Sequence, residues 1–291
     1  MITVQDKIID VKRFPDGTQM LLDFEVDVLY RPTPIKIVWC YESEDEALTL
    51  LYIKKHLENN YKAGYKANIE LYMPYVPNGR MDRVKSDKEI FTLKHFCWFI
   101  NSLGFDKVYI MDPHSIVSEA LIDNVCVLRP SNIISIVIDK MLCLNDFERE
   151  VVIYFPDDGA YKRYKDLPCF IGLKCVYGKK ERDWKTGQII GIKVCDANGE
   201  VLPPHMLDNV DVLMVDDIIS YGGTLAYSAD KLKELGAIKI CAYATHVEDS
   251  AINTDKGTLL KRINSGVVDF VYTTNSLFHE EHPNFVIIHK F

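Results

Sequence analysis

Short apolar runs alternate with longer amphipathic stretches along this chain, and that alternation limits the folds it can adopt. The runs that fit buried strands are 35–40, 69–73, 107–111, 151–155, 212–215 and 238–244. The stretches whose apolar residues recur at helical spacing are 44–59, 88–103 and 224–235. Strands that alternate with helices form parallel sheets covered by helices on both faces, so the sequence predicts an α/β fold.

One sequence pattern occurs twice, at 103–114 and at 235–246. Each copy has Leu-Gly, a lysine soon after it and a histidine at its end, which fits a helix end, a glycine turn, a strand and a polar loop. Two α/β units can resemble one another by chance, but the repeat favours two similar Rossmann-like halves, residues 1–145 and 146–291. Ligands of open α/β sheets bind beyond the carboxyl ends of the strands, so we expect the site there.

The composition favours a globular protein that acts on small molecules. The chain has 291 residues, 34 Lys and Arg against 42 Asp and Glu, and a net charge of −8. This acidic balance argues against partners such as nucleic acid or an anionic membrane. No apolar run approaches the ~18 residues that span a bilayer, and the first residues lack the apolar core of a signal peptide. The eight cysteines form no Cys-x-x-Cys pair, so we expect reduced thiols and a cytoplasmic protein.

The segment 212–225 places acids and glycines between a strand and a helix. Its apolar strand leads to the adjacent carboxylates of Asp216 and Asp217, which suit sugar hydroxyls or a divalent ion. The turn that follows is rich in hydroxyls and glycines, and its backbone N–H groups, with the N-terminus of the next helix, fit a phosphate. An ordinary strand–helix turn with solvated acids is the alternative, but the whole string favours a ribose-phosphate binder.

This segment resembles the phosphate loop of type I phosphoribosyltransferases and of ribose-phosphate pyrophosphokinases. Further motifs similar to the pyrophosphokinases follow in the family's order: Phe14-Pro15-Asp16-Gly17, Pro74-Tyr75 with Arg80-Met81-Asp82-Arg83, Asp112-Pro113-His114, Pro156-Asp157-Asp158-Gly159 with Lys162-Arg163, and 242–246. A phosphoribosyltransferase usually is one such domain and lacks the segment at 80–83. The resemblance to the pyrophosphokinases implies two type I phosphoribosyltransferase-like halves, each a mostly parallel sheet flanked by helices.

The resemblance also implies the reaction. The β,γ-diphosphoryl group of ATP would move to the C1 hydroxyl of a ribose phosphate, with release of AMP, a transfer that needs positioning and charge neutralisation. The residues that the resemblance assigns to ATP are Phe14, Asp16, Arg80, Met81, Arg83 and His114. Among them, Phe14 and Asp16 would reach adenine from a neighbouring subunit of a homo-oligomer, a dimer or a hexamer.

The remaining assignments concern Mg²⁺ and the acceptor. By resemblance, His114 and Asp157 would hold Mg²⁺, directly or through water, and His114 could orient rather than ligate. Asp216 and Asp217 would take the 2′- and 3′-hydroxyls of the ribose. The residues that would hold its 5′-phosphate are Ser220, Tyr221, Gly222, Gly223 and Thr224.

The basic run at 177–183 aligns with the family's mobile catalytic loop, which carries Lys-x-Arg and clamps the migrating group. Lys179 stands at the family's distance from the strand, but Glu181 then occupies the arginine position. Lys180 with Arg182 restores the spacing, so we favour this pair, with Lys179 as the competitor. The loop would continue through Lys185-Thr186-Gly187.

The phosphate loop departs from the family pattern, since it reads Ser-Tyr-Gly-Gly-Thr where most members read Asp-Thr-Gly-Gly-Thr. Ser220 removes a negative charge, and Tyr221 adds a ring on which a base could stack. Both changes suit ADP-ribose, the acceptor of a divergent and largely phage-encoded branch that rebuilds NAD, as an alternative to ribose 5-phosphate. Two other functions stay open: a phosphoribosyltransferase that uses a base, and a catalytically silent regulatory subunit.

Overall fold

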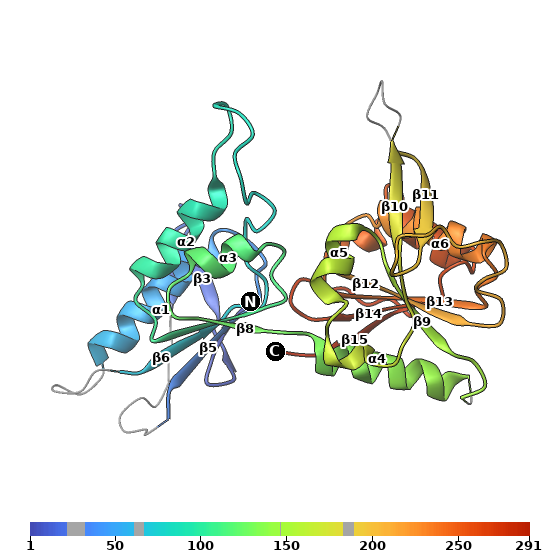
Figure 1. The fold of residues 1–291 in the computed structure, drawn as a ribbon. Helices are drawn as coiled ribbons and strands as arrows, with labels where there is room; N and C mark the ends of the chain where they lie inside the picture. The colour runs from blue at the N-terminus through green and yellow to red at the C-terminus, as the bar shows by residue number, and fades with distance from the viewer. Residues whose placement is uncertain (22–32, 61–66, 146, 183–188) are drawn as a thin grey trace. The chain divides into compact units, whose positions relative to one another are not determined.

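The chain folds into two units, each built around its own sheet (Figure 1). The computed structural model describes residues 1–21, 33–60, 67–145, 147–182 and 189–291, with the side chains of all but 182, 189 and 190. The first unit holds residues 1–129 with Phe291, and the second holds residues 130–290. We expected a boundary after residue 145. The structure divides earlier, because α4 (Ser131–Leu144) packs on strands β9 (Val151–Phe155) and β15 (Phe285–His289) of the second sheet.

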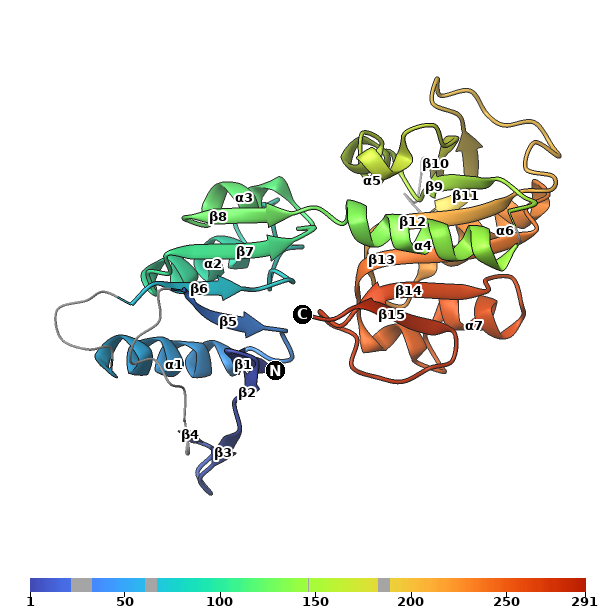
Figure 2. The same ribbon diagram turned by 90° about the horizontal axis from the view of Figure 1, so that it is seen from below.

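The sheet of the first unit has six strands in the order β2-β1-β5-β6-β7-β8, of which Figure 2 shows β5 to β8 side by side. Its strands are β1 (Ile2–Val4), β2 (Lys7–Ile8), β5 (Ile35–Trp39), β6 (Ile69–Tyr72), β7 (Lys107–Met111) and β8 (Val125–Leu128). A separate hairpin pairs β3 (Val11–Arg13) with β4 (Gln19–Leu21). Strands β5 to β8 are parallel, and β1 and β2 are antiparallel to their neighbours.

Three helices connect the parallel strands of this sheet: α1 (Glu46–Asn60), α2 (Thr92–Ser102) and α3 (Ile116–Leu121). Successive strands are direct neighbours, so right-handed crossovers place all three helices on one face, as Figure 1 shows. The sequence had suggested helices on both faces, whereas in the described part of this unit the opposite face carries half-buried polar and aromatic side chains. Tyr72 and Tyr109 stack there with ring centroids 4.2 Å apart.

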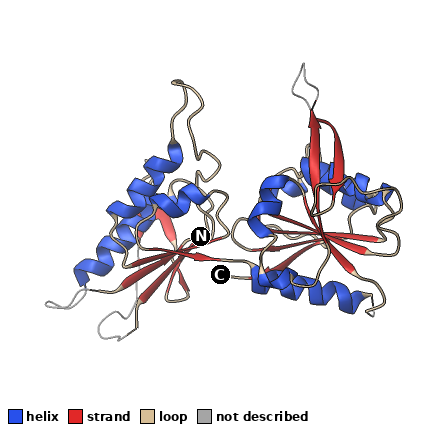
Figure 3. Ribbon diagram, viewed as in Figure 1, coloured by secondary structure: helices blue, strands red, loops and turns tan. Residues whose placement is uncertain are grey.

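The sheet of the second unit has seven strands in the order β11-β10-β9-β12-β13-β14-β15, parallel except for β11. Its further strands are β10 (Cys175–Arg182), β11 (Ile189–Cys195), β12 (Asp211–Ile219), β13 (Lys239–Val247) and β14 (Phe270–Thr274). Its further helices are α5 (Asp158–Tyr164), α6 (Gly223–Glu234) and α7 (Thr258–Asn264), with short 3₁₀ turns η1 (Pro168–Phe170) and η2 (Asp249–Ile252). Figure 3 shows the β10–β11 hairpin projecting beyond the rest of this sheet.

The order of this second sheet reverses between β9 and β12. The chain leaves β9 for β10 on one side and later enters β12 on the other side of β9. Right-handed crossovers in opposite directions place α5 and α6 on opposite faces of the sheet. Such a reversal opens a crevice at the carboxyl ends of the two strands, which is where ligands of doubly wound folds bind.

The repeated pattern is confirmed in its first half. Gly104 and Gly236 follow α2 and α6 with φ of +64° and +105°, a conformation that favours glycine, and a strand follows each. The histidines differ, because His114 lies beyond β7 whereas β13 runs on through His246. Two mostly parallel sheets flanked by helices confirm the predicted α/β fold. None of the described helices is long and apolar enough to cross a membrane.

Candidate active site

Asp157 lies beyond the carboxyl end of β9, after Pro156, and is the N-cap of α5. One carboxylate oxygen of Asp157 accepts a hydrogen bond from the Ala160 N–H at 3.0 Å, the geometry of an N-cap. The other lies 3.1 Å from the Lys180 ammonium on β10. Burial acts to raise the pKa of Asp157, but the Ala160 N–H and the Lys180 ammonium outweigh it and lower that pKa below its usual value. Asp157 is therefore held as a carboxylate.

The two acids of the central motif lie within β12, not after it as we expected. The strand continues because Asp216 and Ile218 pair with Ala244 and His246 of β13. Consecutive strand residues start from opposite faces, but the side chains of Asp216 and Asp217 remain within hydrogen-bond reach of one another. Asp216 is partly buried, and Asp217 is only 4% exposed.

Each of these two acids has its own electrostatic surroundings. Asp217 forms an ion pair with Arg163 of α5, with 2.9 Å between Nη1 and Oδ1. Asp216 accepts a hydrogen bond from the Asp217 N–H at 3.0 Å. Burial first, and then the Asp217 carboxylate, raise the pKa of Asp216 well above its usual value. The sequence motif therefore supplies one paired acid and one that is harder to ionise.

The predicted phosphate loop connects β12 to α6. Gly222 adopts a φ of +73° and caps α6, and the first N–H with a partner inside the helix is that of Ala226, which donates to Gly222 O at 2.9 Å. The N–H groups of the first helical residues precede that bond, so they point out of the helix N-terminus and can bind an anion. A Cβ on Gly222 would lie within 3.1 Å of Leu259 Cδ2, so only glycine fits this position.

The start of α7 fixes the middle of this loop. The Tyr221 carbonyl accepts hydrogen bonds from Thr258 Oγ1 at 2.8 Å, from the Thr258 N–H at 2.9 Å and from the Leu259 N–H at 3.2 Å. The Tyr221 side chain itself is 41% exposed. Ser220 and Thr224 flank the glycines at the end of β12 and inside α6. Ser220, Tyr221, Gly222, Gly223 and Thr224 therefore lie together between the carboxyl end of β12 and the first turn of α6.

The basic run that we assigned to a loop lies on a strand instead. Its residues pair with β11, and Lys179 and Lys180 stand opposite Lys193 and Ile192. The continuous antiparallel pairing of this hairpin explains the difference from the predicted loop. Arg182 ends β10 but its side chain is outside the described residues, as are Lys185-Thr186-Gly187.

The strand geometry separates Lys179 from Lys180. The two side chains point to opposite faces of β10. Lys180 shares its face with Gly178, against which the Tyr154 hydroxyl packs, and contacts Asp157. Lys179 is exposed on the face where Tyr177 stacks on Tyr161 of α5, with ring centroids 4.8 Å apart. Only Lys180 of the two reaches a predicted site residue within the described contacts.

A hydrogen-bonded chain that the sequence did not reveal supports this region. The buried Tyr154 hydroxyl donates to Ser228 Oγ at 2.8 Å, and Ser228 Oγ donates to Thr224 O at 2.9 Å. A Cβ on Gly178 would lie 2.9 Å from Pro156 O and closer still to the Tyr154 hydroxyl. β9, β10 and α6 are therefore tied together. The sequence offered only weak signals for these contacts. They were Gly178, directly before the two lysines, and Arg163 in the helix that Asp157 caps.

The first unit carries the residues expected to bind ATP. His114 is partly buried in the turn between β7 and α3, whose N-cap is Ser115. A Cβ on Gly79 would lie 3.9 Å from His114 Cβ, so the segment with Arg80 borders the histidine turn. Arg80 is exposed, and Met81 is 38% exposed. Arg83 is mostly exposed, with its Nε 3.7 Å from Asp82. Arg80, Met81 and Arg83 are therefore exposed at the surface of this unit.

The β3–β4 hairpin presents the other two residues assigned to ATP. Phe14 is 49% exposed, and the Asp16 carboxylate accepts hydrogen bonds from Thr18 Oγ1 at 2.7 Å and from its N–H at 2.9 Å. These Thr18 hydrogen bonds lower the pKa of Asp16. Arg13 ties the hairpin to α1 through an ion pair with Asp45 at 3.0 Å.

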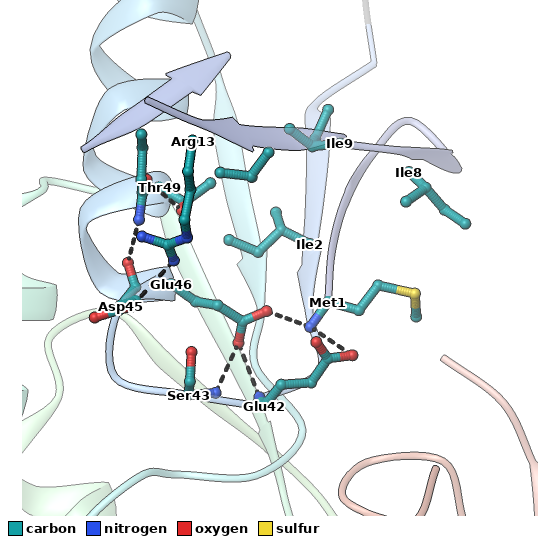
Figure 4. Close-up of a pocket in the computed structure, with 12 residues that line it drawn as sticks. Met1, Ile2, Ile8, Ile9, Arg13, Glu42, Ser43, Asp45, Glu46 and Thr49 are labelled. Atoms are coloured by element: carbon teal, nitrogen blue, oxygen red, sulfur yellow. Dashed lines mark hydrogen bonds and ion pairs between the residues drawn. The ribbon is translucent and has the colours of Figure 1, made fainter. Parts of the chain in front are cut away.

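A cavity of about 310 Å³ lies under this hairpin, between β1–β2 and the start of α1 (Figure 4). The Met1 ammonium contacts Glu46 there and lies 3.2 Å from Glu42. Glu46 also accepts a hydrogen bond from Trp39 Nε1 at 2.8 Å. The charged groups of this cavity thus pair with one another, and it holds none of the predicted site residues. Among the described residues, no three His, Cys, Asp or Glu side chains gather in a metal-binding group.

Comparison with known proteins identifies the family. No model of a known protein family matches the chain. The chain is 30% identical over 241 residues to a ribose-phosphate pyrophosphokinase of Pyrococcus abyssi, covering 82% of this chain and 75% of that protein. It is 28% identical over 283 residues to a ribose-phosphate pyrophosphokinase of Campylobacter jejuni, covering 96% and 82%. The phosphoribosylpyrophosphate synthetase of Mycobacterium smegmatis shares the fold, with a TM-score of 0.71 over 97% of this chain and 86% of that chain at 17% identity. The chain therefore belongs to the ribose-phosphate pyrophosphokinase family of transferases.

Proposed function

We propose that the chain transfers the β,γ-diphosphoryl group of ATP to the C1 hydroxyl of a 5-phosphorylated ribose. The observation that carries this proposal is the arrangement at the reversal of the second sheet. There the partly buried Asp216 precedes a loop with a left-handed Gly222 and a free helix N-terminus, and the Lys180–Asp157 pair lies on the neighbouring strands. Carboxylates suit sugar hydroxyls, and the helix N-terminus suits a phosphate.

In this reaction the C1 oxygen forms a bond to the β-phosphorus of ATP. The bond from the β-phosphorus to the oxygen that bridges it to the α-phosphorus breaks, and AMP leaves with that oxygen. The hydroxyl proton is lost to water. Lys180 is the cation we assign to the migrating group, with Arg182 beside it on β10, because a fixed ammonium stabilises charge that develops there.

Mg²⁺ is the cation that we assign to this reaction. It prefers oxygen ligands, keeps several waters and is usually bound through one or two carboxylates together with substrate phosphates. Asp157 offers such a carboxylate in the second unit, and His114 of the first unit would act through water. When bound, Mg²⁺ neutralises charge on the ATP phosphates, while Lys180 keeps Asp157 ionised and oriented.

The test is the release of AMP from ATP with Mg²⁺ and ribose 5-phosphate. We expect AMP and phosphoribosyl diphosphate in equal amounts, and we expect Asp216→Asn to lower kcat/KM by about 100-fold, the scale of a lost transition-state contact. ATP binding without AMP formation would instead favour a silent regulatory subunit. Consumption of phosphoribosyl diphosphate with a free base, and no need for ATP, would favour a phosphoribosyltransferase.

ADP-ribose is the acceptor that two observations favour over ribose 5-phosphate. The Tyr221 ring is exposed beside the phosphate loop, where it can stack on adenine. Lys256 is exposed and lies two residues before Thr258, whose hydroxyl donates a hydrogen bond to the Tyr221 carbonyl. The second phosphate of ADP-ribose, bound near Tyr221, would therefore lie within reach of this cation. The measurement is the ratio of kcat/KM for the two acceptors. Tyr221→Thr and Lys256→Ala should each shift this ratio towards ribose 5-phosphate by about 5- to 10-fold, and an unchanged ratio would exclude both residues from the choice.

Assembly is the last part of the proposal. Phe14 and Asp16 stand on a hairpin of the first unit with an exposed aromatic ring. We assign this hairpin to the adenine site of a second copy. Sedimentation should give a dimer or a larger assembly, and mixing Phe14→Ala with Lys180→Met subunits should restore AMP release if the hairpin acts on its neighbour.

A further inference from the structure

Arg163 is placed to control one acid of the central motif. Its guanidinium lies 2.9 Å from the Asp217 carboxylate, and the two side chains are 25% and 6% exposed. The same guanidinium lies over the Tyr164 ring, 5.8 Å from its centroid, and that ring stacks on Phe155 of β9. Removing one partner of an ion pair this shielded from water leaves the other charge buried, which is costly.

Within the part of the chain that the structure describes, Asp216 forms no ion pair, and its partners are the N–H and the side chain of Asp217. Met214 starts from the same face of β12 as Asp216, and it pairs with Tyr154 of β9. The Tyr154 hydroxyl donates a hydrogen bond to Ser228 of α6, the helix that begins at the phosphate loop. Asp216 therefore faces the side of the sheet that leads to the predicted acceptor site, while Asp217 faces α5.

We propose that Arg163 is a positioning residue of the acceptor site, which holds Asp217 on the α5 face so that Asp216 is the carboxylate that meets the ribose hydroxyls. This inference rests on the proposed function. It differs from the sequence expectation, in which Asp216 and Asp217 both take the ribose hydroxyls.

The charges around Asp216 give the proposal a pH dependence. The titratable and charged groups that act on the two acids from the packed elements are Tyr154 of β9, Asp157 beyond its end and Arg163 of α5. Burial and the nearby Asp217 and Asp157 carboxylates raise the pKa of Asp216. Loss of the Arg163 cation would leave the Asp217 charge uncompensated, so Asp216 would ionise at a higher pH.

The experiment is calorimetric binding of ribose 5-phosphate between pH 5 and 9, with the pH profile of kcat/KM beside it. The variants are Arg163→Met, Arg163→Lys and a matched control, Arg262→Met. Arg262 is a suitable control because it pairs with Asp230 through two bonds of 2.7 Å between α7 and α6, also in the second unit.

Binding needs ionised Asp216, so affinity falls as the pH drops through its pKa. With Arg163→Met we expect this fall to move up by about one pH unit and the affinity at pH 7 to drop about tenfold. Arg163→Lys keeps the cation and should keep the midpoint, and Arg262→Met should not move it.

Equal midpoints for Arg163→Met and Arg262→Met would overturn the inference. So would a larger loss of binding from Asp217→Asn than from Asp216→Asn. A wild-type chain that binds ribose 5-phosphate with the expected pH dependence but releases no AMP would instead overturn the proposed function and leave the role of Arg163 standing.

Discussion

The Lys180 ammonium lies 3.1 Å from Oδ2 of Asp157, and this contact joins β10 to the end of β9. Asp157 also caps α5, so one carboxylate fixes both a helix start and the direction of a lysine. Lys179, the next residue, points to the other face of the strand. The hairpin therefore presents the two lysines to different surroundings, and their replacement should have different effects.

Lys180→Met should lower the kcat of AMP release by about 100- to 1000-fold, because it removes the cation that we propose for the migrating group. Lys179→Met, its matched control, should stay within about threefold of the wild type. Steady-state AMP release at saturating ATP and acceptor measures both. A larger loss from Lys179→Met would assign the catalytic role to the other register.

Gly178→Ala should destabilise the second unit by about 2–3 kcal/mol, the cost of overpacking a well-packed site. The new methyl group would lie 2.9 Å from Pro156 O and against the Tyr154 hydroxyl, both held by strand β9 and its end. Gly191→Ala on the partner strand is the control, since its methyl would lie 3.3 Å from the end of the flexible Glu181 side chain. Urea unfolding of the two variants checks this, and equal midpoints would contradict it.

The alternation of apolar runs was sufficient to predict the fold class, and the site at the strand ends remains a prediction. The runs in the second sheet are buried on both faces, as β9 is throughout, and such strands stand out in a sequence without any partner being known. The phosphate loop was predicted from the whole string of strand, acids, glycines and helix, since Gly222 and Gly223 alone also fit an ordinary strand–helix turn.

What the sequence left open depends on contacts between distant segments. The choice between Lys179 and Lys180 required the pairing of β10 with β11, since one residue of register exchanges the faces. The Arg163–Asp217 pair joins residues of α5 and β12, and no local pattern marks it. The boundary shifted for the same reason: α4 has an apolar face, but only packing on β9 and β15 decides to which unit it belongs.

Gly222→Ala should cost about 2–4 kcal/mol of unfolding free energy and weaken acceptor binding. Its φ of +73° is unfavourable for alanine, and the added methyl would press on Leu259 of α7. Gly223→Ala is the matched control, because its methyl would meet only Thr258 Oγ1 at 3.6 Å and its φ is not in the left-handed region. Urea unfolding should separate the two variants by more than about 1 kcal/mol. Similar stabilities would show that the loop can relax around Gly222.

Asp216→Asn should stabilise the protein without ligands at pH 8, although it lowers activity. The pKa of Asp216 is raised in the folded state above the ordinary value of 3.8, so ionising the carboxylate costs folding free energy as the pH rises through the folded pKa. Below pH 3.8 the carboxyl is protonated in both states, and the advantage of asparagine should vanish there.

Glu58→Gln should give the opposite sign. Burial acts to raise the pKa of Glu58, but its hydrogen bonds to Lys54 and Lys55 lower that pKa. The wild type should therefore be more stable than Glu58→Gln above the usual pKa and lose that advantage as the pH falls. Thermal unfolding from pH 3 to 8 measures both variants, and a difference for Asp216→Asn that does not grow with pH would show that its carboxylate is not strained by burial.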